Sequence, residues 1–77
     1  MKRLQILGAD CPNCRKLFEN AEDAARELQI QFVMEKITDI DRIGDFGVTM
    51  TPALAINSEV KSQGKILNVE EIKTLLL

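Results

Sequence analysis

The feature that most constrains this chain is the segment Cys11-Pro12-Asn13-Cys14, which holds its only two cysteines. The segment stands where a short apolar run ending at Gly8 gives way to a helical pattern. Two cysteines separated by two residues at a strand-to-helix junction are typical of a redox dithiol. The rest of the chain is then expected to hold this pair at the start of a helix and to offer a surface to a partner.

Length and composition narrow the class of protein. The 77 residues predict one domain over residues 1–77, near the lower size limit for folding on a hydrophobic core alone. A net charge of −2 without a basic stripe argues against nucleic acid as a partner. No stretch predicts a signal peptide or a membrane span, and two cysteines are too few for a disulfide-stapled secreted scaffold. We therefore expect a cytoplasmic protein without direct membrane insertion.

Apolar periodicity predicts seven elements in the order strand, helix, strand, short helix, strand, strand, helix. Strands are expected at 4–7, 30–37, 53–56 and 59–62, and helices at 12–29, at 40–46 and after residue 68. Pro12 suits the first position of the first helix, where an N–H would lack a partner in any case. Asn68 and Glu71 form a variant of the capping box before the last helix. The first strand–helix–strand unit predicts two parallel strands with a right-handed crossover.

The spacing of the cysteines predicts different roles for the two sulfur atoms. Thiol–disulfide exchange requires a thiolate, and at an ordinary pKa near 8.5 only about 3% of a thiol is ionised at pH 7. As the N-cap of the first helix, Cys11 would face unpaired N–H groups and the positive end of the helix dipole, which lower a thiol pKa. Cys11 is therefore the candidate nucleophile, and Cys14, one turn later, is the candidate resolving cysteine.

Three neighbours of the cysteines are candidates for modulating the site, namely Asp10, Pro12 and Asn13. An inward carboxylate at Asp10 would raise the pKa of Cys11, whereas a solvated one would have little effect. Both alternatives stay open from the sequence.

These features together resemble the thioredoxin superfamily, and more narrowly the small single-domain redox-active disulfide proteins of bacteria and archaea called glutaredoxin-like thioredoxins. The resemblance rests on the cysteine pair between the first strand and the first helix, on Thr51-Pro52 before the third strand, and on Gly64 after the fourth. It implies a minimal thioredoxin-like α/β fold, βαβ-α-ββα. Its four-stranded mixed sheet has the order 2-1-3-4, with helices on both faces.

The resemblance also implies an activity and a set of site residues. The activity is that of a thiol–disulfide oxidoreductase that reduces protein disulfides without cofactor or metal. Its partners are a disulfide-containing protein substrate and an upstream reductase or dithiol donor, and we expect a monomer or weak dimer. Thr51, Pro52 and Gly64 are the implied substrate-binding residues, with a cis bond before Pro52. A trans proline opening an edge strand would also be unremarkable.

The segment departs from the better-known relatives, and a second class of protein uses a similar motif. Ala9-Asp10 replaces the usual aromatic residue before the first cysteine, and Pro12-Asn13 is neither Gly-Pro nor Pro-Tyr. These departures leave the substrate and the electron donor open. The alternative function is a soft-metal module or metallochaperone that binds Cu(I) or zinc through the same two thiolates. Heavy-metal chaperone domains differ, however, in the element order after the first helix.

The remaining apolar residues of interest are expected to serve the core. Phe46 and Met50 are expected to be core residues rather than substrate contacts. Leu75, Leu76 and Leu77 end the chain and predict either core packing of the last helix or an exposed apolar patch.

Overall fold

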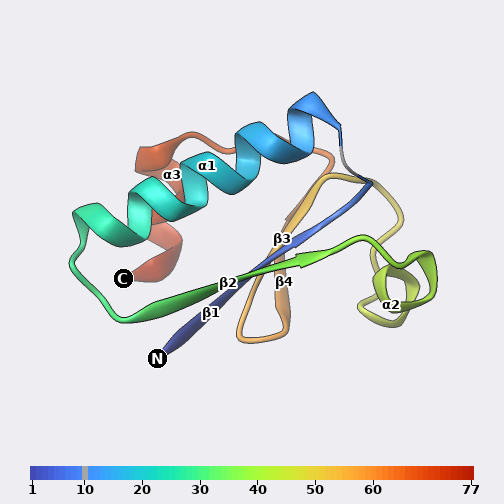
Figure 1. Ribbon diagram of the computed structural model, residues 1–77, viewed down its shortest axis with the longest axis horizontal. Helices are drawn as coiled ribbons and strands as arrows, with labels where there is room; N and C mark the ends of the chain where they lie inside the picture. Colours follow the sequence, from blue (N-terminus) through green and yellow to red (C-terminus); the bar gives the residue numbers. More distant parts are fainter. Residues whose placement is uncertain (10) are drawn as a thin grey trace.

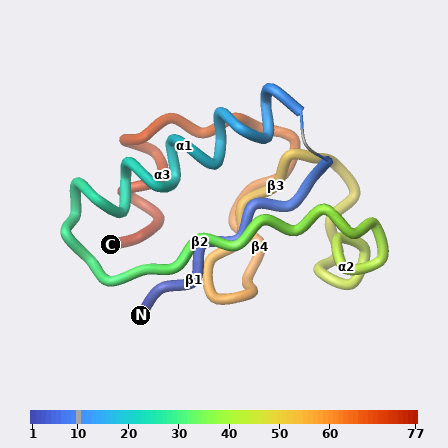
Figure 2. The backbone as a smooth tube through the Cα atoms, in the orientation of Figure 1, coloured from blue at the N-terminus to red at the C-terminus, as the bar shows by residue number. Residues whose placement is uncertain are grey.

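The computed structural model describes residues 1–9 and 11–77, so statements about the fold concern those residues. The elements are β1 (Lys2–Leu7), α1 (Pro12–Glu27), β2 (Phe32–Ile37), α2 (Ile40–Asp45), β3 (Ala53–Ile56), β4 (Glu59–Gln63) and α3 (Val69–Leu76). Figures 1 and 2 show how they are arranged in space. The predicted order of seven elements is confirmed. The α/β fold is the minimal thioredoxin-like one that the sequence implied.

The sheet has four strands in the order β2-β1-β3-β4. β1 pairs with β2 in parallel, with Lys2 opposite Phe32, and antiparallel with β3, with Leu7 opposite Ala53. β3 pairs antiparallel with β4 and carries a register irregularity between Leu54 and Ala55. The predicted mixed sheet is therefore confirmed. The βαβ unit and the following hairpin share β1 as a central strand.

Helices lie on both faces of the sheet, but they cover the faces unequally. α1 and α3 pack against each other on one face, as Figure 1 shows. Beneath them lies a first core of fully or largely buried residues: Leu4, Ile6, Leu17, Ala21, Ala24, Ala25, Leu54, Ile56, Leu67, Ile72 and Leu76. The three alanines let α1 approach the sheet closely. On the other face, Ile43 of α2 and Val48 cover only a second core at one end, with Leu7, Ile37, Ala53 and Ala55.

The first helix is shorter at its end than the sequence predicted. α1 stops at Glu27 rather than residue 29, because Gln29 adopts a left-handed conformation with φ of 56°. The N–H of Gln29 donates to the carbonyl of Arg26 at 3.0 Å, and the N–H of Ile30 donates to that of Ala25 at 3.4 Å. This pattern is a Schellman motif, which ends a helix and turns the chain. Ile30 therefore lies in the connection, and β2 begins two residues later than expected.

The β3–β4 hairpin uses the predicted turn Asn57-Ser58, with φ of 52° and 68°. Positive φ is unfavourable for serine, but its N–H donates to Gln5 Oε1 at 2.7 Å. The Gln5 side chain is 1% exposed, and its Nε2 donates to Glu35 Oε1 at 3.2 Å. A buried amide satisfied in this way fixes the hairpin on the less covered face of the sheet.

The last helix begins with the capping box that the sequence predicted. Asn68 Oδ1 accepts from the N–H of Glu71 at 2.8 Å, and Glu71 Oε1 accepts from the N–H of Asn68 at 3.1 Å. Lys73 Nζ of α3 lies 3.2 Å from Glu27 Oε1 of α1, and Asn20 Nδ2 of α1 donates to the carbonyl of Leu67, just before α3, at 2.9 Å. The last two leucines differ in burial: Leu76 is 4% exposed and packs in the core, whereas Leu77 is 90% exposed.

We predict that Asn68→Ala lowers the free energy of unfolding by about 1 kcal/mol, because the N3 amide of α3 loses its acceptor. Asn68→Asp keeps an acceptor at the cap and is the matched control, with a loss of a few tenths of a kcal/mol. Urea denaturation followed by circular dichroism measures both variants. Equal losses for the two substitutions would contradict the assigned capping role.

Candidate active site

The two cysteines and Thr51-Pro52 lie at the same end of the sheet because of the strand pairing. β1 and β3 are antiparallel with Leu7 opposite Ala53. The chain leaving β1 at Gly8 therefore faces the chain entering β3 at Pro52. Cys11 follows three residues after Gly8 and is the N-cap of α1 at this end of the sheet. Residues about 40 positions apart in sequence thus form one site.

Cys11 is the N-cap of α1, as the sequence predicted. Its backbone is extended, with φ of −126° and ψ of 163°, and its Sγ accepts from the N–H of Cys14 at 3.2 Å. Its carbonyl accepts from the N–H of Arg15 at 3.0 Å, which is the first hydrogen bond of the helix. The first turn of α1 contains no acidic residue that would oppose an anion there. A negative charge on the Cys11 sulfur is stabilised at this position.

Cys14 lies one turn further along α1 and is far less accessible than Cys11. Cys14 is 2% exposed, whereas Cys11 is partly exposed, and neither cysteine forms a disulfide. Burial raises the pKa of the Cys14 thiol, and the neighbouring Cys11 sulfur adds to that rise, while the charge of Lys36 opposes it. The two sulfurs thus differ in exposure, as the sequence indicated, and burial disfavours the thiolate form of Cys14.

The candidate modulating residues fall into two groups. Pro12 occupies the first position of α1 and Asn13 follows it, and both are exposed beside the cysteines. The prediction for Asp10 lies outside the described residues.

The three substrate-binding candidates lie close to one another at the loop before β3, and Thr51 and Pro52 share with Cys14 the surroundings of Gly8. Thr51 is exposed, Pro52 is buried, and the peptide bond between them is cis. Gly64 has φ of 70°, and its N–H donates to the carbonyl of Pro52 at 2.9 Å. A methyl group on Gly64 would lie 3.1 Å from Met50 Cε. Gly64 therefore packs against the loop before β3, and its missing side chain leaves room for that methionine.

Gln63 holds the same loop, and sequence reasoning missed it. Its Oε1 accepts from the N–H of Thr49 at 3.0 Å and from the N–H of Met50 at 3.4 Å. Gln63 also pairs with Ala53 across the β3–β4 ladder. One side-chain oxygen therefore fixes the backbone immediately before Thr51-Pro52. No local sequence signal predicts this contact, because it joins residues 13 and 14 positions apart.

Gly8 is the second residue that sequence reasoning missed as part of the site. Its φ is 153°, and a methyl group on it would lie 2.8 Å from Cys14 Sγ and 3.3 Å from Thr51 Cβ. Its N–H donates to the carbonyl of Ile37 at 2.9 Å. Gly8 therefore lies where the dithiol meets the loop before β3. Its position at the end of an apolar run was the only available signal.

The expectation that Met50 belongs to the core is wrong. Met50 is 61% exposed, because its side chain lies over Gly64, which is itself exposed after the end of β4. Phe46, by contrast, is partly buried against the second core, as expected. Ile40, the first residue of α2, is 83% exposed. Met50 thus adds an apolar side chain to the surface near Thr51.

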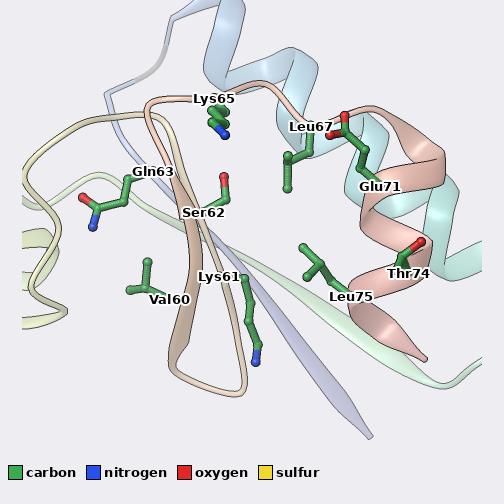
Figure 3. Close-up of a pocket in the computed structure, with 9 residues that line it drawn as sticks. All are labelled: Val60, Lys61, Ser62, Gln63, Lys65, Leu67, Glu71, Thr74 and Leu75. Carbon is green, nitrogen blue, oxygen red and sulfur yellow. The ribbon is translucent and has the colours of Figure 1, made fainter.

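A cavity of about 630 Å³ lies away from the cysteines, between β4 and α3 (Figure 3). It is lined by Val60, Lys61, Ser62, Gln63, Lys65, Leu67, Glu71, Thr74 and Leu75. Neither cysteine, Thr51 nor Pro52 contributes to its wall. The dithiol therefore does not open into this cavity.

Residues 1–9 and 11–77 are the part of the chain whose metal and membrane features the structure describes. Within that part of the chain, no three Cys, Asp or Glu side chains are grouped as metal ligands. Nor does any helix there have the length and apolar character needed to cross a membrane.

Comparison with known proteins gives one consistent result. Residues 2–77 match the thioredoxin domain family. A protein named thioredoxin from Methanothermobacter thermautotrophicus is 42% identical over 76 residues, which covers 99% of each chain. Another protein named thioredoxin, from Methanocaldococcus jannaschii, is 39% identical over 70 residues, covering 91% of this chain and 80% of that protein.

We predict that the stability of the reduced protein depends on pH through Cys14. A thiol whose pKa is raised by folding stabilises the folded state below its ordinary value of 9.0, and that contribution is lost as the pH rises through the folded-state pKa. The free energy of unfolding should fall by up to about 1.4 kcal/mol per pH unit in this range. Urea denaturation under reductant measures it, and Cys14→Ala should remove this part of the slope. Parallel pH profiles for the two proteins would contradict the assignment.

We predict that Gln63→Met exposes the amides of Thr49 and Met50 to solvent exchange, because the acceptor oxygen is lost while the side-chain size is kept. Gln63→Glu retains an acceptor and is the matched control. Loss of a hydrogen bond of ordinary strength should make the exchange of each amide roughly three- to tenfold faster. Hydrogen exchange followed by NMR measures both amides. Unchanged exchange in Gln63→Met would show that this contact does not hold the loop.

Proposed function

The chain belongs to the thioredoxin family and is a thioredoxin-like disulfide oxidoreductase, and from that premise we propose that it reduces protein disulfides through Cys11 and Cys14. Cys11 is the attacking thiolate and Cys14 is the resolving thiol. An upstream reductase or dithiol donor returns the protein to its reduced form. The proposed compartment is the cytoplasm, whose reducing poise keeps such a dithiol supplied with electrons.

The observation that carries this proposal is the asymmetry of the two sulfurs. Cys11 is partly exposed at the N-cap of α1 and accepts a backbone N–H at 3.2 Å, while Cys14 is 2% exposed. A substrate disulfide can therefore reach Cys11 before it reaches Cys14. The helix N-terminus favours the thiolate form of the accessible Cys11, and burial favours the protonated form of Cys14 before the second exchange step.

The reaction has two exchange steps. The Cys11 thiolate attacks one sulfur of the substrate disulfide, so that a mixed disulfide forms and the other substrate sulfur leaves as a thiolate. Cys14 then loses its proton and attacks Cys11 Sγ, which releases the second substrate sulfur as a thiolate. The substrate gains two electrons and two protons, and the protein gains an intramolecular disulfide. A two-electron donor must reduce that disulfide before the next cycle.

The loop before β3 supports substrate docking beside the dithiol. Thr51 is exposed, and the loop is held from behind by Gln63 and Gly64. We propose that the backbone of Thr51 pairs with an extended substrate segment, as in strand addition. The exposed Met50 then offers an apolar contact to the same segment.

We predict that Cys14→Ser traps a substrate or a model disulfide on Cys11, because the mixed disulfide forms but the resolving sulfur is missing. Cys11→Ser is the matched control and should trap none under the same conditions. Mass spectrometry of the protein after incubation with a peptide disulfide measures the adduct. Trapping by Cys11→Ser at the rate of Cys14→Ser, or none by Cys14→Ser, would overturn the assigned roles.

The same two thiolates could serve a soft-metal module, so the test of function includes a metal arm. The observed order of elements after α1 is strand, helix, strand, strand, helix, unlike the order in heavy-metal chaperone domains. Titration with Cu(I) and Zn(II), beside a redox titration against dithiothreitol, separates the two activities. A potential near roughly −270 mV supports the reductase. Tight one-to-one Cu(I) binding without disulfide reductase activity would replace it with the metal-binding function.

A further inference from the structure

We propose that Gly8 is a positioning residue for the resolving sulfur, and that its missing side chain provides the space that the Cys14 thiol occupies in the reduced protein. The inference rests on the proposed function and deepens it, because it names what sets the balance between dithiol and disulfide. It concerns a residue outside the cysteine motif. The residue is placed there by the pairing of β1 with its two neighbouring strands.

Atoms of Cys14, Thr51 and Pro52 fill the space next to the Cα atom of Gly8. The three atoms nearest to a methyl group on Gly8 would be Cys14 Sγ at 2.8 Å, Thr51 Cβ at 3.3 Å and Pro52 Cα at 3.6 Å. A carbon–sulfur approach of 2.8 Å lies well inside van der Waals contact, so one of the atoms must move. Gly8 also has φ of 153°, a conformation that a residue with a Cβ adopts rarely.

The surrounding backbone offers little freedom to retreat. The N–H of Gly8 donates to the carbonyl of Ile37 at 2.9 Å, which fixes Gly8 to β2. The carbonyl of Pro52 accepts from the N–H of Gly64 at 2.9 Å, which fixes the opposite wall, and Pro52 itself is buried. The atom that can move by rotation about one bond is Cys14 Sγ. A methyl group at Gly8 therefore acts mainly on this sulfur.

The sign of the effect follows from the change in sulfur positions on oxidation. Two free thiols stay apart at van der Waals distance, whereas a disulfide brings the sulfurs to about 2.05 Å. Cys11 is not among the three residues nearest to the methyl position. Cys11 Sγ lies 3.2 Å from the backbone nitrogen of Cys14, so bond formation turns Cys14 Sγ back toward the N-terminus of α1, and this rotation is proposed to lead away from Gly8. A methyl group on Gly8 crowds Cys14 Sγ in the dithiol form, and formation of the disulfide relieves that crowding.

The test is the redox equilibrium of Gly8→Ala against glutathione. In this exchange the two protein thiols give two electrons and two protons to glutathione disulfide, which becomes two glutathione thiols, while a Cys11–Cys14 bond forms. Gly8→Ala should shift the equilibrium constant toward the protein disulfide by about fivefold, the low end of what overpacking a filled site costs. No shift, or a shift toward the dithiol, would overturn the proposal.

Gly47→Ala is the matched control. Gly47 also has a positive φ, of 81°, but a methyl group on it would meet nothing within 4 Å. It also places a methyl group on a glycine of positive φ, but without the contact to sulfur. The redox equilibrium of Gly47→Ala should equal that of the unmodified protein. An equal shift in both variants would assign the effect to backbone strain and overturn the role of Gly8.

A second measurement keeps the proposal falsifiable if Gly8→Ala folds poorly. Gly8→Ala is made again in a Cys14→Ala background, where the sulfur that the methyl group meets is absent. The loss of thermal midpoint under reductant should be smaller in that background than with Cys14 present. Equal losses in the two backgrounds, or failure of both Gly8→Ala proteins to fold, would show that the sulfur is not what Gly8 accommodates.

The outcomes separate this inference from the proposed function. If Cys14→Ser traps a mixed disulfide and Gly8→Ala leaves the redox equilibrium unchanged, the role of Gly8 is wrong and the function stands. If no mixed disulfide is trapped, the reductase function is wrong. The glutathione equilibrium of Gly8→Ala still tests the contact between Gly8 and Cys14.

Discussion

The antiparallel pairing of β1 with β3 is the constraint on which the rest of the site depends. With Leu7 opposite Ala53, the chain leaving β1 and the chain entering β3 meet at one end of the sheet. α1 starts from that end and is held over the sheet by the first core. A slip of one residue in this register would turn the apolar side chains of β1 to the opposite face and separate Gly8 from Pro52. Core and site are thus fixed by the same hydrogen bonds.

Local signals in the sequence predicted most of the fold and, within the site, the two cysteines at the start of α1. The N-cap at Cys11, the capping box at Asn68 and the turn at Asn57 each depend on residues within three positions of one another, and the structure contains all three. Their order along the chain, read beside Thr51-Pro52, was sufficient to indicate the topology. Local hydrogen bonding therefore specifies where elements begin and end.

What the sequence could not supply are contacts made across the fold. Gln63 reads as one more polar residue of an edge strand, yet its side chain fixes the loop before β3. Met50 reads as core, but its side chain lies over the exposed Gly64. Gly8 reads as the end of a strand, and its closeness to Cys14 follows only from the strand register. Side-chain identity alone does not predict such neighbours.

Buried and exposed residues of the site differ in what a substitution can change. Cys14 is 2% exposed and its sulfur lies against Gly8, so a side chain added at Gly8 is expected to alter the redox equilibrium and the packing together. Pro12 and Asn13, by contrast, are exposed on the first turn of α1 beside the accessible sulfur. Substitutions there can change the surface offered to a partner while leaving the core untouched. The exposed surface beside the dithiol and the packing around its buried sulfur are therefore formed by different residues.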